Sequence, residues 1–394
     1  MRTRPMPITP FFLLTALLHA YIAVRLVPGL APWWPAGIVL GAMLLVSAVA
    51  LPVPMWARRK PLHPAWQWLG AIAMGWFSSL LVLTLLRDLL LAAWWAAGAA
   101  GVVAAPAAAA WRHGSAAAVV LAAVAASAIG LWNARRTARV RRIDIALPQL
   151  PAALQGFTIA QLSDLHVGPT IGRGYIARIV ERVNALQPDV VAITGDLVDG
   201  SVPTLRDRIA PLADLRSRHG SYVVTGNHEY YAGAHAWIDE LRRMGMTVLM
   251  NQHVLLRPAA GAGGAQGGDA DALLLAGVTD FHAGHFDAAH ASDPVQALHG
   301  APAAATARVL MAHQPRSAPA AADAGFQLQL SGHTHGGQFW PWNLFVPLQQ
   351  PFVAGLHRVR GLQVYVSRGT GYWGPPKRLG APSEITLLRL VRQA

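Results

Sequence analysis

Eight side chains of metal-ligand or acid–base type are spread through the C-terminal two-thirds of this 394-residue chain, each just after a hydrophobic run. They are Asp164, His166, Asp196, Asn227, His228, His313, His333 and His335. In the Asp-x-His and His-x-His spacings, both side chains project to the same side of an extended chain. A lone histidine at a strand end is usually structural, but eight such groups in five separate turns indicate a shared site.

The donor types suit a transition-metal centre. Carboxylate and amide oxygens together with imidazoles match Mn²⁺, Fe²⁺ or Zn²⁺. The donors other than His228 outnumber the ligands that one tetrahedral ion binds. They suit two ions that share a bridging carboxylate. Two ions about 3.5–4 Å apart can bind one phosphoryl group and acidify a water between them. Neighbouring glycines would leave space for ions and phosphate, namely Gly195, Gly226, Gly332, Gly336 and Gly337.

Short hydrophobic runs that end in glycine-containing polar turns predict the strands that position these donors. The runs cover 156–168, 188–200, 221–231, 247–256, 273–281, 307–315, 326–338, 362–371 and 384–391. Residues 174–187 and 235–246 have the spacing of helices. Because strands and helices alternate early and strands dominate later, we expect residues 143–394 to form an α/β domain with a layered, mixed-sheet core.

The N-terminal third has the composition of a membrane segment. The whole chain is 54% hydrophobic and only 13% charged, with a mean hydropathy of +0.35. Apolar stretches at 8–30, 35–57, from Trp66 onward and at 115–132 each approach the roughly 20 residues that cross a bilayer. Apolar sequence continues past Arg87 and Asp88, which allows either one long helix or a further span. A signal peptide is disfavoured because more spans follow the first stretch.

Basic residues favour four spans. Residues 1–142 hold 13 Lys/Arg and one acid, whereas the rest of the chain is nearly neutral. The basic clusters precede the first span, follow the second at 57–61 and follow the last at 134–142, so four spans place all of them on the cytoplasmic side. We therefore predict a multi-pass inner-membrane protein with cytoplasmic termini and a cytoplasmic catalytic domain. The excess charge is interpreted as membrane topology and not as a nucleic-acid surface.

Five motifs resemble, in order and spacing, the signature blocks of the calcineurin-like metallophosphoesterase superfamily. They are "SDLHVG", "TGDLVDG", "TGNHEYY", "MAHQP" and "SGHTHGGQ". The resemblance covers residues 155–394, and the tail "YVSRGTGYWGPPKRLGAPSEITLLRL" looks like the membrane-associated bacterial branch. It implies a layered α-β-β-α sandwich at 143–394, after a four-helix transmembrane region at 1–142.

The resemblance also implies a role for each candidate residue. Asp164, His166 and His335 would hold one divalent ion, and Asp196 would bridge to a second. Asn227, His313 and His333 would complete the second ion's ligands. His228 would contact the phosphate and protonate the leaving oxygen as a general acid.

These inferences predict a membrane-anchored phosphoesterase that cleaves a phosphomonoester, phosphodiester or pyrophosphate bond by attack of a metal-bridging hydroxide. The membrane anchor favours a lipid-linked or envelope-precursor substrate. One alternative is a receptor or transporter whose soluble domain binds a phospholigand without hydrolysis, and another is a protein phosphatase. The absence of cysteine excludes disulfides and thiol catalysis.

Several other polar residues receive structural interpretations. Asp199 is expected to cap or turn the chain, and Glu229 to support the turn that carries Asn227. Arg368 is expected either near an anionic substrate or in a salt bridge. The histidines of "HAGHFDAAH" (282–290) are expected in a solvated loop and not in an extra zinc site. Residues 259–272, rich in Gly, Ala and Asp, are expected to form a hairpin loop.

Overall fold

The structure is a computed structural model that describes residues 8–52, 63–102, 108–258 and 268–393. The chain divides into two compact units, one of residues 1–132 with 374–377 and the other of residues 133–373 with 378–394. Most of the expected hairpin loop, residues 259–267, lies outside the described residues.

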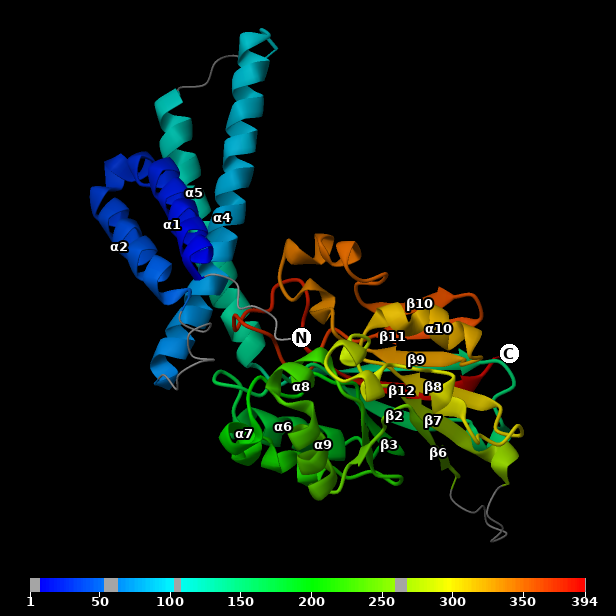
Figure 1. The fold of residues 1–394 in the computed structure, drawn as a ribbon. Coiled ribbons are helices and arrows are strands. Elements are labelled where there is room, and N and C mark those ends of the chain that lie inside the picture. The colour runs from blue at the N-terminus through cyan, green and yellow to red at the C-terminus, as the bar shows by residue number, and fades with distance from the viewer. Residues whose placement is uncertain (1–7, 53–62, 103–107, 259–267, 394) are drawn as a thin grey trace. The chain divides into compact units, whose positions relative to one another are not determined.

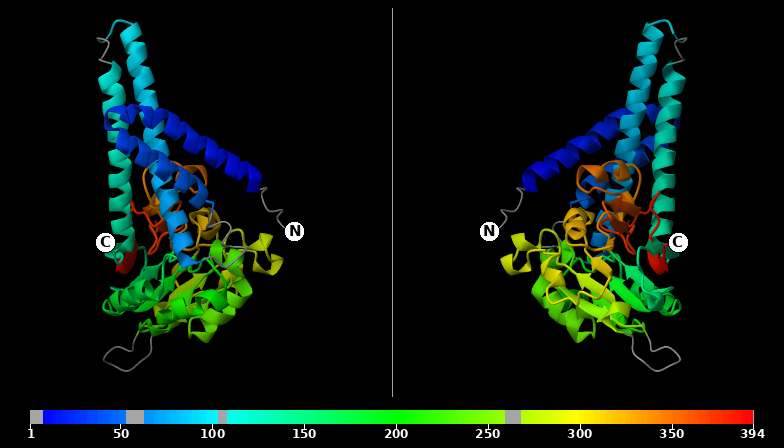
Figure 2. Two further views of the ribbon diagram at one scale, coloured as in Figure 1. Left: turned by 90° about the vertical axis from the view of Figure 1, so that its left-hand side faces the viewer. Right: turned by 90° about the vertical axis from the view of Figure 1, so that its right-hand side faces the viewer.

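The first unit is helical. Its helices are α1 (Ile8–Leu26), α2 (Trp34–Ala50), α4 (Pro64–Ala99) and α5 (Ala108–Arg135), with the 3₁₀ turn η1 (Pro28–Trp33) before α2. Within the described residues, three segments are long and apolar enough to cross a membrane, namely Pro28–Ala50, Pro64–Ala99 and Ala110–Arg135, and a shorter apolar helix covers Pro10–Leu26. Figures 1 and 2 show α4 as one uninterrupted helix, so the apolar sequence beyond Arg87 continues the third expected span.

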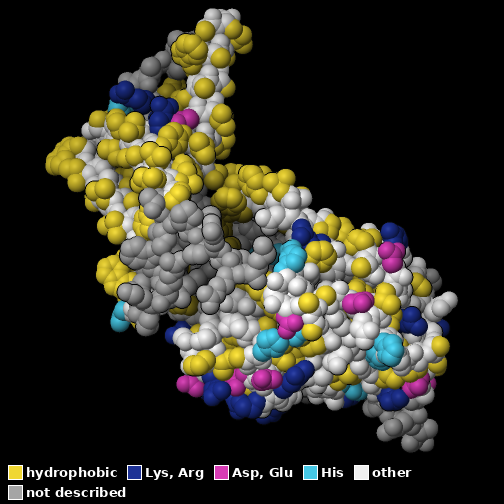
Figure 3. All heavy atoms as spheres, in the orientation of Figure 1, with side chains coloured by type: hydrophobic (Ala, Val, Ile, Leu, Met, Phe, Trp, Pro, Cys, Tyr) yellow, Lys and Arg dark blue, Asp and Glu magenta, His cyan; other side chains and the backbone are white. Residues whose placement is uncertain are grey.

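The surface of this unit is unusually apolar for exposed helices. Leu17, Leu45 and Leu121 are each more than 65% exposed, and hydrophobic side chains dominate the face of these helices in Figure 3. Large exposed apolar faces indicate contact with lipid or another apolar partner. With the apolar lengths above, this composition supports membrane association.

Three charged residues of the helical unit form one paired cluster. Asp88 accepts hydrogen bonds from Arg25 Nε at 2.6 Å and from Tyr21 OH at 2.7 Å, and Arg87 Nη1 lies 3.1 Å from its other oxygen. Pairing reduces the cost of placing charges among apolar helices. These contacts indicate a structural role for Arg25, Arg87 and Asp88 within the helical unit.

The second unit contains two mixed sheets of six strands each. The first has the order β1-β12-β2-β3-β4-β5, and its strands are β1 (Arg139–Leu147), β2 (Thr158–Leu162), β3 (Val190–Ile193), β4 (Ser221–Val223), β5 (Thr247–Val248) and β12 (Glu384–Arg392). The second has the order β10-β11-β9-β8-β7-β6, and its strands are β6 (Gln252–Leu256), β7 (Leu273–Gly277), β8 (Ala307–Met311), β9 (Leu328–Ser331), β10 (Gly355–Val359) and β11 (Leu362–Val366).

The sheets pack face to face, with helices on their outer faces. Ile159 and Val190 belong to the core between the sheets, whereas their neighbours Ala160 and Val191 face the outer layer. Helices α6 (Arg173–Asn184), α7 (Val202–Ile209) and α9 (Ala234–Arg243) cover the first sheet, and α10 (Ala318–Asp323) packs on the second. Because both faces are covered, the inner strands β3 and β7 are apolar at every position. The expected α-β-β-α sandwich is confirmed.

Two local predictions differ from the structure. The basic stretch 134–142 was expected to be a loop, but β1 begins at Arg139 and pairs with β12 in parallel at the edge of the first sheet. The single strand expected at 247–256 is two strands, β5 and β6, in different sheets. Asn251 between them has a positive φ of 54°, which turns the chain from one sheet to the other.

Candidate metal centre

The expected site residues all follow the ends of five strands. Asp164 and His166 follow β2, Asp196 follows β3, and Asn227 and His228 follow β4 at the start of α8 (Asn227–Ala232). His313 follows β8, and His333 and His335 follow β9. Strands β2, β3 and β4 are parallel neighbours, as are β8 and β9, so their carboxyl ends lie side by side.

Hydrogen bonds join the two sheets beneath these turns. Gln161 of β2 donates through Nε2 to the carbonyl oxygen of Ser331 at the end of β9, at 2.9 Å. His313 Nδ1 lies 2.7 Å from the carbonyl oxygen of Thr194, which follows β3. With the proton on Nδ1, this bond leaves His313 Nε2 as a free lone pair facing the site. The strand ends of both sheets therefore meet at one place.

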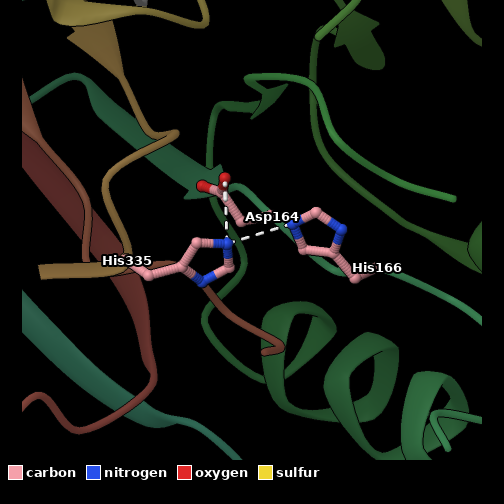
Figure 4. A group of neighbouring side chains, drawn as sticks. All are labelled: Asp164, His166 and His335. Atoms are coloured by element: carbon pink, nitrogen blue, oxygen red, sulfur yellow. Dashed lines mark hydrogen bonds and ion pairs between the residues drawn. The ribbon is translucent and has the colours of Figure 1, made fainter. Parts of the chain in front are cut away.

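One group of donors consists of Asp164, His166 and His335 (Figure 4). The Nε2 atoms of His166 and His335 are 3.0 Å apart, and His335 Nε2 is 3.6 Å from Asp164 Oδ1. All three side chains are buried. Two imidazole nitrogens at this separation need a proton or a cation between them, because their lone pairs repel each other. The group could hold a metal ion.

A second group consists of Asp196, His313 and His333. His313 Nε2 lies 3.2 Å from Asp196 Oδ2 and 3.2 Å from His333 Nδ1. The nearby Asn227 Oδ1 is buried and has no hydrogen-bond partner among the residues that the structure describes. An unsatisfied buried oxygen is costly, so this atom fits the role of a metal ligand.

Asp196 lies between the two groups. Its Oδ2 atom is 3.7 Å from His166 Nε2 in the first group and 3.2 Å from His313 Nε2 in the second. Its Oδ1 atom accepts a hydrogen bond from the backbone of His228 at 2.8 Å. A single carboxylate oxygen is thus within reach of both groups, which is the arrangement a bridging ligand requires.

The backbone of the site is strained. Asp164, His166, Asp196, His333 and His335 have positive φ angles between 48° and 71°. This left-handed conformation costs non-glycine residues about 1–2 kcal/mol each and persists only where surrounding contacts enforce it. Strain concentrated in five candidate ligands indicates that the fold places these side chains for a function.

Glu229 supplies one of the enforcing contacts. Its carboxylate accepts hydrogen bonds from the backbone nitrogens of Asp196 at 2.9 Å, Leu197 at 2.7 Å and Gly226 at 2.7 Å. Burial, and then the negative charge of Asp196, raise the pKa of Glu229. The residue ties the turn after β3 to the turn after β4, in agreement with the expected supporting role.

Two of the neighbouring glycines are required by close approach. A Cβ atom on Gly332 would lie 1.9 Å from Ser163 Oγ and 2.2 Å from Asp164 Oδ2. A Cβ atom on Gly226 would lie 2.2 Å from Asp196 Oδ1. At these two positions a side chain would therefore displace a candidate ligand.

Asp199 has a different position from the one expected. Its Oδ1 atom accepts from Nδ1 of His166 at 3.0 Å and from Nδ1 of His228 at 2.6 Å, if each ring carries its proton there. Burial alone would raise the pKa of Asp199, but His166 and His228 hold it below its ordinary value. Burial likewise opposes charge on His166, but Asp199 and Asp196 outweigh it and raise the pKa of His166 to about 9. Asp199 therefore orients two site histidines, a role that the expected cap or turn did not include.

His228 lies at the rim of the site. Its Nε2 atom is 4.0 Å from Asp196 Oδ2, and its side chain is 12% exposed. The ring also contacts Tyr231 and Trp373 edge-on, with centroid separations of 5.3 and 5.9 Å. The Nε2 atom is thus accessible to a molecule bound at the donors.

Arg378 is a further site neighbour that the sequence did not indicate. It is fully buried, and its guanidinium lies 2.9 Å from the carbonyl oxygen and 3.0 Å from Nδ1 of His335. Burial and the neighbouring Arg378 keep the pKa of His335 well below its ordinary value, so the ring is neutral. Arg368 instead forms a salt bridge with Glu384 at 3.5 Å. Of the two roles expected for Arg368, the structure therefore supports the salt bridge.

Comparisons with known proteins agree with this geometry. Residues 157–337 match the family model described as calcineurin-like phosphoesterase. A Bos taurus "transmembrane protein with metallophosphoesterase domain" is 43% identical over 67% of this chain and 60% of its own length. Metallophosphoesterases named as uncharacterized from Campylobacter jejuni and Helicobacter pylori are 36% and 37% identical over 66% of this chain, covering 64% and 66% of their own lengths. The matched part of this chain thus spans less than two thirds of each of these relatives.

Proposed function

We propose that this chain, whose residues 157–337 match the calcineurin-like phosphoesterase family model, is a membrane-anchored phosphoesterase with a two-ion centre. In this proposal residues 1–142 are the anchor and residues 143–394 the catalytic domain. The main supporting observation is that two groups of donors share Asp196, together with the buried Oδ1 of Asn227, which has no hydrogen-bond partner among the described residues.

The donors divide between two ions in this proposal. Asp164, His166 and His335, which form one close group, would hold one ion, and His313 and His333, which group with Asp196, would hold the other. Asn227 would complete the second set through its buried Oδ1 atom. Asp196 would be shared, since its Oδ2 atom is within 4 Å of a histidine from each group. Bound divalent ions supply the charge that neutralises a phosphoryl group and activates water as the nucleophile.

His228 would act as the general acid. The Nδ1 atom of His228 lies 2.6 Å from Asp199 Oδ1, so His228 Nε2 points away from Asp199 and is free to donate a proton. The same bond fixes the orientation of the ring, so that Nε2 can face the leaving oxygen. The proton would pass from His228 Nε2 to the oxygen that leaves the phosphorus.

An apolar segment beside the site supports an amphiphilic substrate. Residues 337–354 contain no charged side chain and follow the turn of His335 directly. Five large side chains of this segment are between 44% and 80% exposed, namely Trp340, Trp342, Leu344, Phe345 and Leu348. Close packing of Asn343 against Gly337 keeps the segment next to the site. Tryptophan, phenylalanine and leucine on one exposed loop are typical of surfaces that enter a membrane interface.

We infer that the substrate is a lipid-linked phosphoester whose apolar part contacts residues 340–348. In the same proposal the protein is a multi-pass inner-membrane protein with four spans, and its catalytic domain lies in the cytoplasm. This orientation rests on the basic clusters before the first span, at 57–61 and at 134–142.

Turnover of a generic substrate tests the catalytic proposal. The purified protein in detergent, assayed with bis(p-nitrophenyl) phosphate and Mn²⁺, is expected to hydrolyse it. Asp196→Asn should lower the rate more than about 100-fold, since even outer partners of metal ligands are worth 10–100-fold. Asp239→Asn, an exposed aspartate on α9, is the matched control. Binding of phosphate without turnover under any divalent metal would instead support the receptor alternative.

A double variant tests the substrate proposal. Leu344→Ser with Leu348→Ser removes two side chains that are 64% and 80% exposed, so the fold should tolerate it. We expect hydrolysis of a phospholipid in vesicles to fall about 10-fold or more. Each replaced leucine removes up to about 1.5–3 kcal/mol of the favourable free energy of burying its side chain. Hydrolysis of bis(p-nitrophenyl) phosphate should not change, and Val295→Ser, at a 68% exposed position, should leave both rates intact.

The cellular substrate can be sought by extracting lipids from cells that overexpress or lack the protein. Phosphorylated lipids that accumulate on depletion and fall on overexpression are the expected candidates. If no phosphorylated lipid changes while bis(p-nitrophenyl) phosphate is still hydrolysed, the lipid proposal is wrong and the catalytic one stands.

A further inference from the structure

A third group of metal-ligand side chains lies outside the proposed two-ion centre. It consists of His235, the second residue of α9, and of Asp287 and His290, which begin and end the 3₁₀ turn around residues 288–290. The sequence separates His235 from the other two by about fifty residues, and the expectation for 282–290 was a solvated loop. In the structure His290 is turned toward α9, whereas His282 contacts Gln314.

We propose that His235, Asp287 and His290 bind a transition-metal ion of the Zn²⁺ type. His235 Nε2 lies 3.1 Å from Asp287 Oδ2, and His290 Nε2 lies 4.0 Å from the same oxygen. One donor atom from each residue lies within 4.8 Å of the other two. Zinc binds such donors at about 2.0–2.2 Å, which places them roughly 3–3.5 Å apart. A shift on the order of 1 Å, within reach of a side-chain rotation, would close the site.

In Asp287 and His290, the atoms that do not face the site already have partners. Asp287 Oδ1 accepts a hydrogen bond from the backbone nitrogen of Ala289 at 3.0 Å, which leaves Oδ2 for the ion. His290 Nδ1 lies 3.0 Å from the hydroxyl of Tyr230, which leaves Nε2. Partners on the far side of the ligand are how proteins orient metal-binding histidines and carboxylates. The two partly buried ligands are thus held in place before an ion binds.

An ordinary ion pair between His235 and Asp287 would explain only part of this arrangement. It would need a protonated His235, whose side chain is 72% exposed, and it gives no reason for His290 Nε2 to face the same oxygen. Two imidazoles and one carboxylate favour Zn²⁺, Co²⁺ or Ni²⁺ over Mg²⁺ or Ca²⁺.

An ion here would join parts of the chain that border the proposed active site. Tyr230, which contacts His290, lies on α8 with Asn227 and His228. Phe286 of the same loop packs against Tyr230 and Tyr231, with ring centroids 5.6 and 5.7 Å apart. The site would therefore fix the loop 282–291 against α8 and α9 without supplying a ligand to the two-ion centre.

Zinc content tests the proposal. The full-length protein in detergent is stripped with a chelator, reloaded with Zn²⁺, desalted and measured by mass spectrometry for zinc per chain. His235→Ala and Asp287→Asn are each expected to bind one zinc fewer than the wild type. His285→Ala, an exposed histidine of the same loop, should bind as many as the wild type. Tyr230→Phe should keep the site but weaken its zinc affinity about 10-fold, as the loss of an outer partner does.

The proposal is overturned if either His235→Ala or Asp287→Asn retains the wild-type zinc content. Failure of the two-ion proposal would look different, because Asp196→Asn would then keep wild-type activity and zinc content, while His235→Ala would still bind one zinc fewer than the wild type. Visible absorption of Co²⁺ gives a second readout, since His235→Ala should lose the bands of one bound ion and His285→Ala should not.

Discussion

Asp199→Asn separates the two tasks assigned to one carboxylate. Asp199 Oδ1 accepts from His166 Nδ1 at 3.0 Å and from His228 Nδ1 at 2.6 Å. Asparagine has nearly the same shape and keeps one acceptor oxygen, but it loses the negative charge. We therefore expect the fold to survive and the orientation of both rings to weaken.

The magnitude follows from the two hydrogen bonds. A hydrogen bond to a charged group contributes about 1.5–3 kcal/mol. Because Asp199 is 24% exposed and one acceptor remains, we discount the sum of two such bonds to about 2–3 kcal/mol. At 1.36 kcal/mol for each tenfold change, this corresponds to a loss of about 30- to 150-fold in kcat/KM.

The assay is hydrolysis of bis(p-nitrophenyl) phosphate over a range of Mn²⁺ concentrations. Weaker orientation of His166 should raise the Mn²⁺ concentration needed for half-maximal rate, and saturating Mn²⁺ should restore that part of the loss. Weaker orientation of His228 should lower kcat even at saturating Mn²⁺. Asp239→Asn controls for the loss of one negative charge from the domain.

A loss of less than about threefold in kcat/KM would refute the reasoning. It corresponds to far less free energy than even one hydrogen bond to a charged group contributes. A full rescue by Mn²⁺ would refute the role of Asp199 toward His228 and leave only its role toward His166.

Three further predictions address the donors, the backbone and the topology. Asn227→Ala removes the buried oxygen that has no partner among the described residues, so metal per chain should fall toward one ion in the two-ion centre. The circular dichroism spectrum should not change. Unchanged metal content and rate would exclude Asn227 as a ligand. Gly332→Ala places a Cβ atom 2.2 Å from Asp164 Oδ2 and should abolish activity, whereas Gly361→Ala, with nothing within 4 Å of its Cβ position, should not; wild-type activity in Gly332→Ala would contradict the close packing. A C-terminal reporter that is active only in the cytoplasm should be active when fused to this chain, and periplasmic activity would reverse the proposed orientation.

The main features of the candidate centre could be predicted because they are local. A buried strand is a short apolar run, and its end is marked by glycine and a polar turn, so Asp164, Asp196 and His313 could each be placed at a strand end. The rule that parallel strands meet at their carboxyl ends then brings such residues together without any knowledge of their contacts. The family resemblance and the layered fold follow from the same local signals.

Other features depend on partners that are distant in sequence. Asp199 looked like a turn residue, because nothing local shows that two histidine rings point at it from different strands. Arg378 lies more than forty residues from His335, which it contacts. Strand β1 was missed because the arginines of "RVRRIDIAL" resemble a cytoplasmic basic cluster, although Ile145 and Leu147 face the core between the sheets.

By itself the sequence determined the apolar character of the N-terminal third, most of the strands in the C-terminal domain, and the residue types gathered at the strand ends. Hydrophobic period, turn residues and charge bias are properties of short segments, so they can be read along the chain. Only the tertiary structure decided which donors share an oxygen, which carboxylate orients a ring, and that His235 meets Asp287 and His290. The physical reason is that hydrogen bonding and metal coordination require separations of a few ångströms, and packing sets those distances between residues that the sequence keeps far apart.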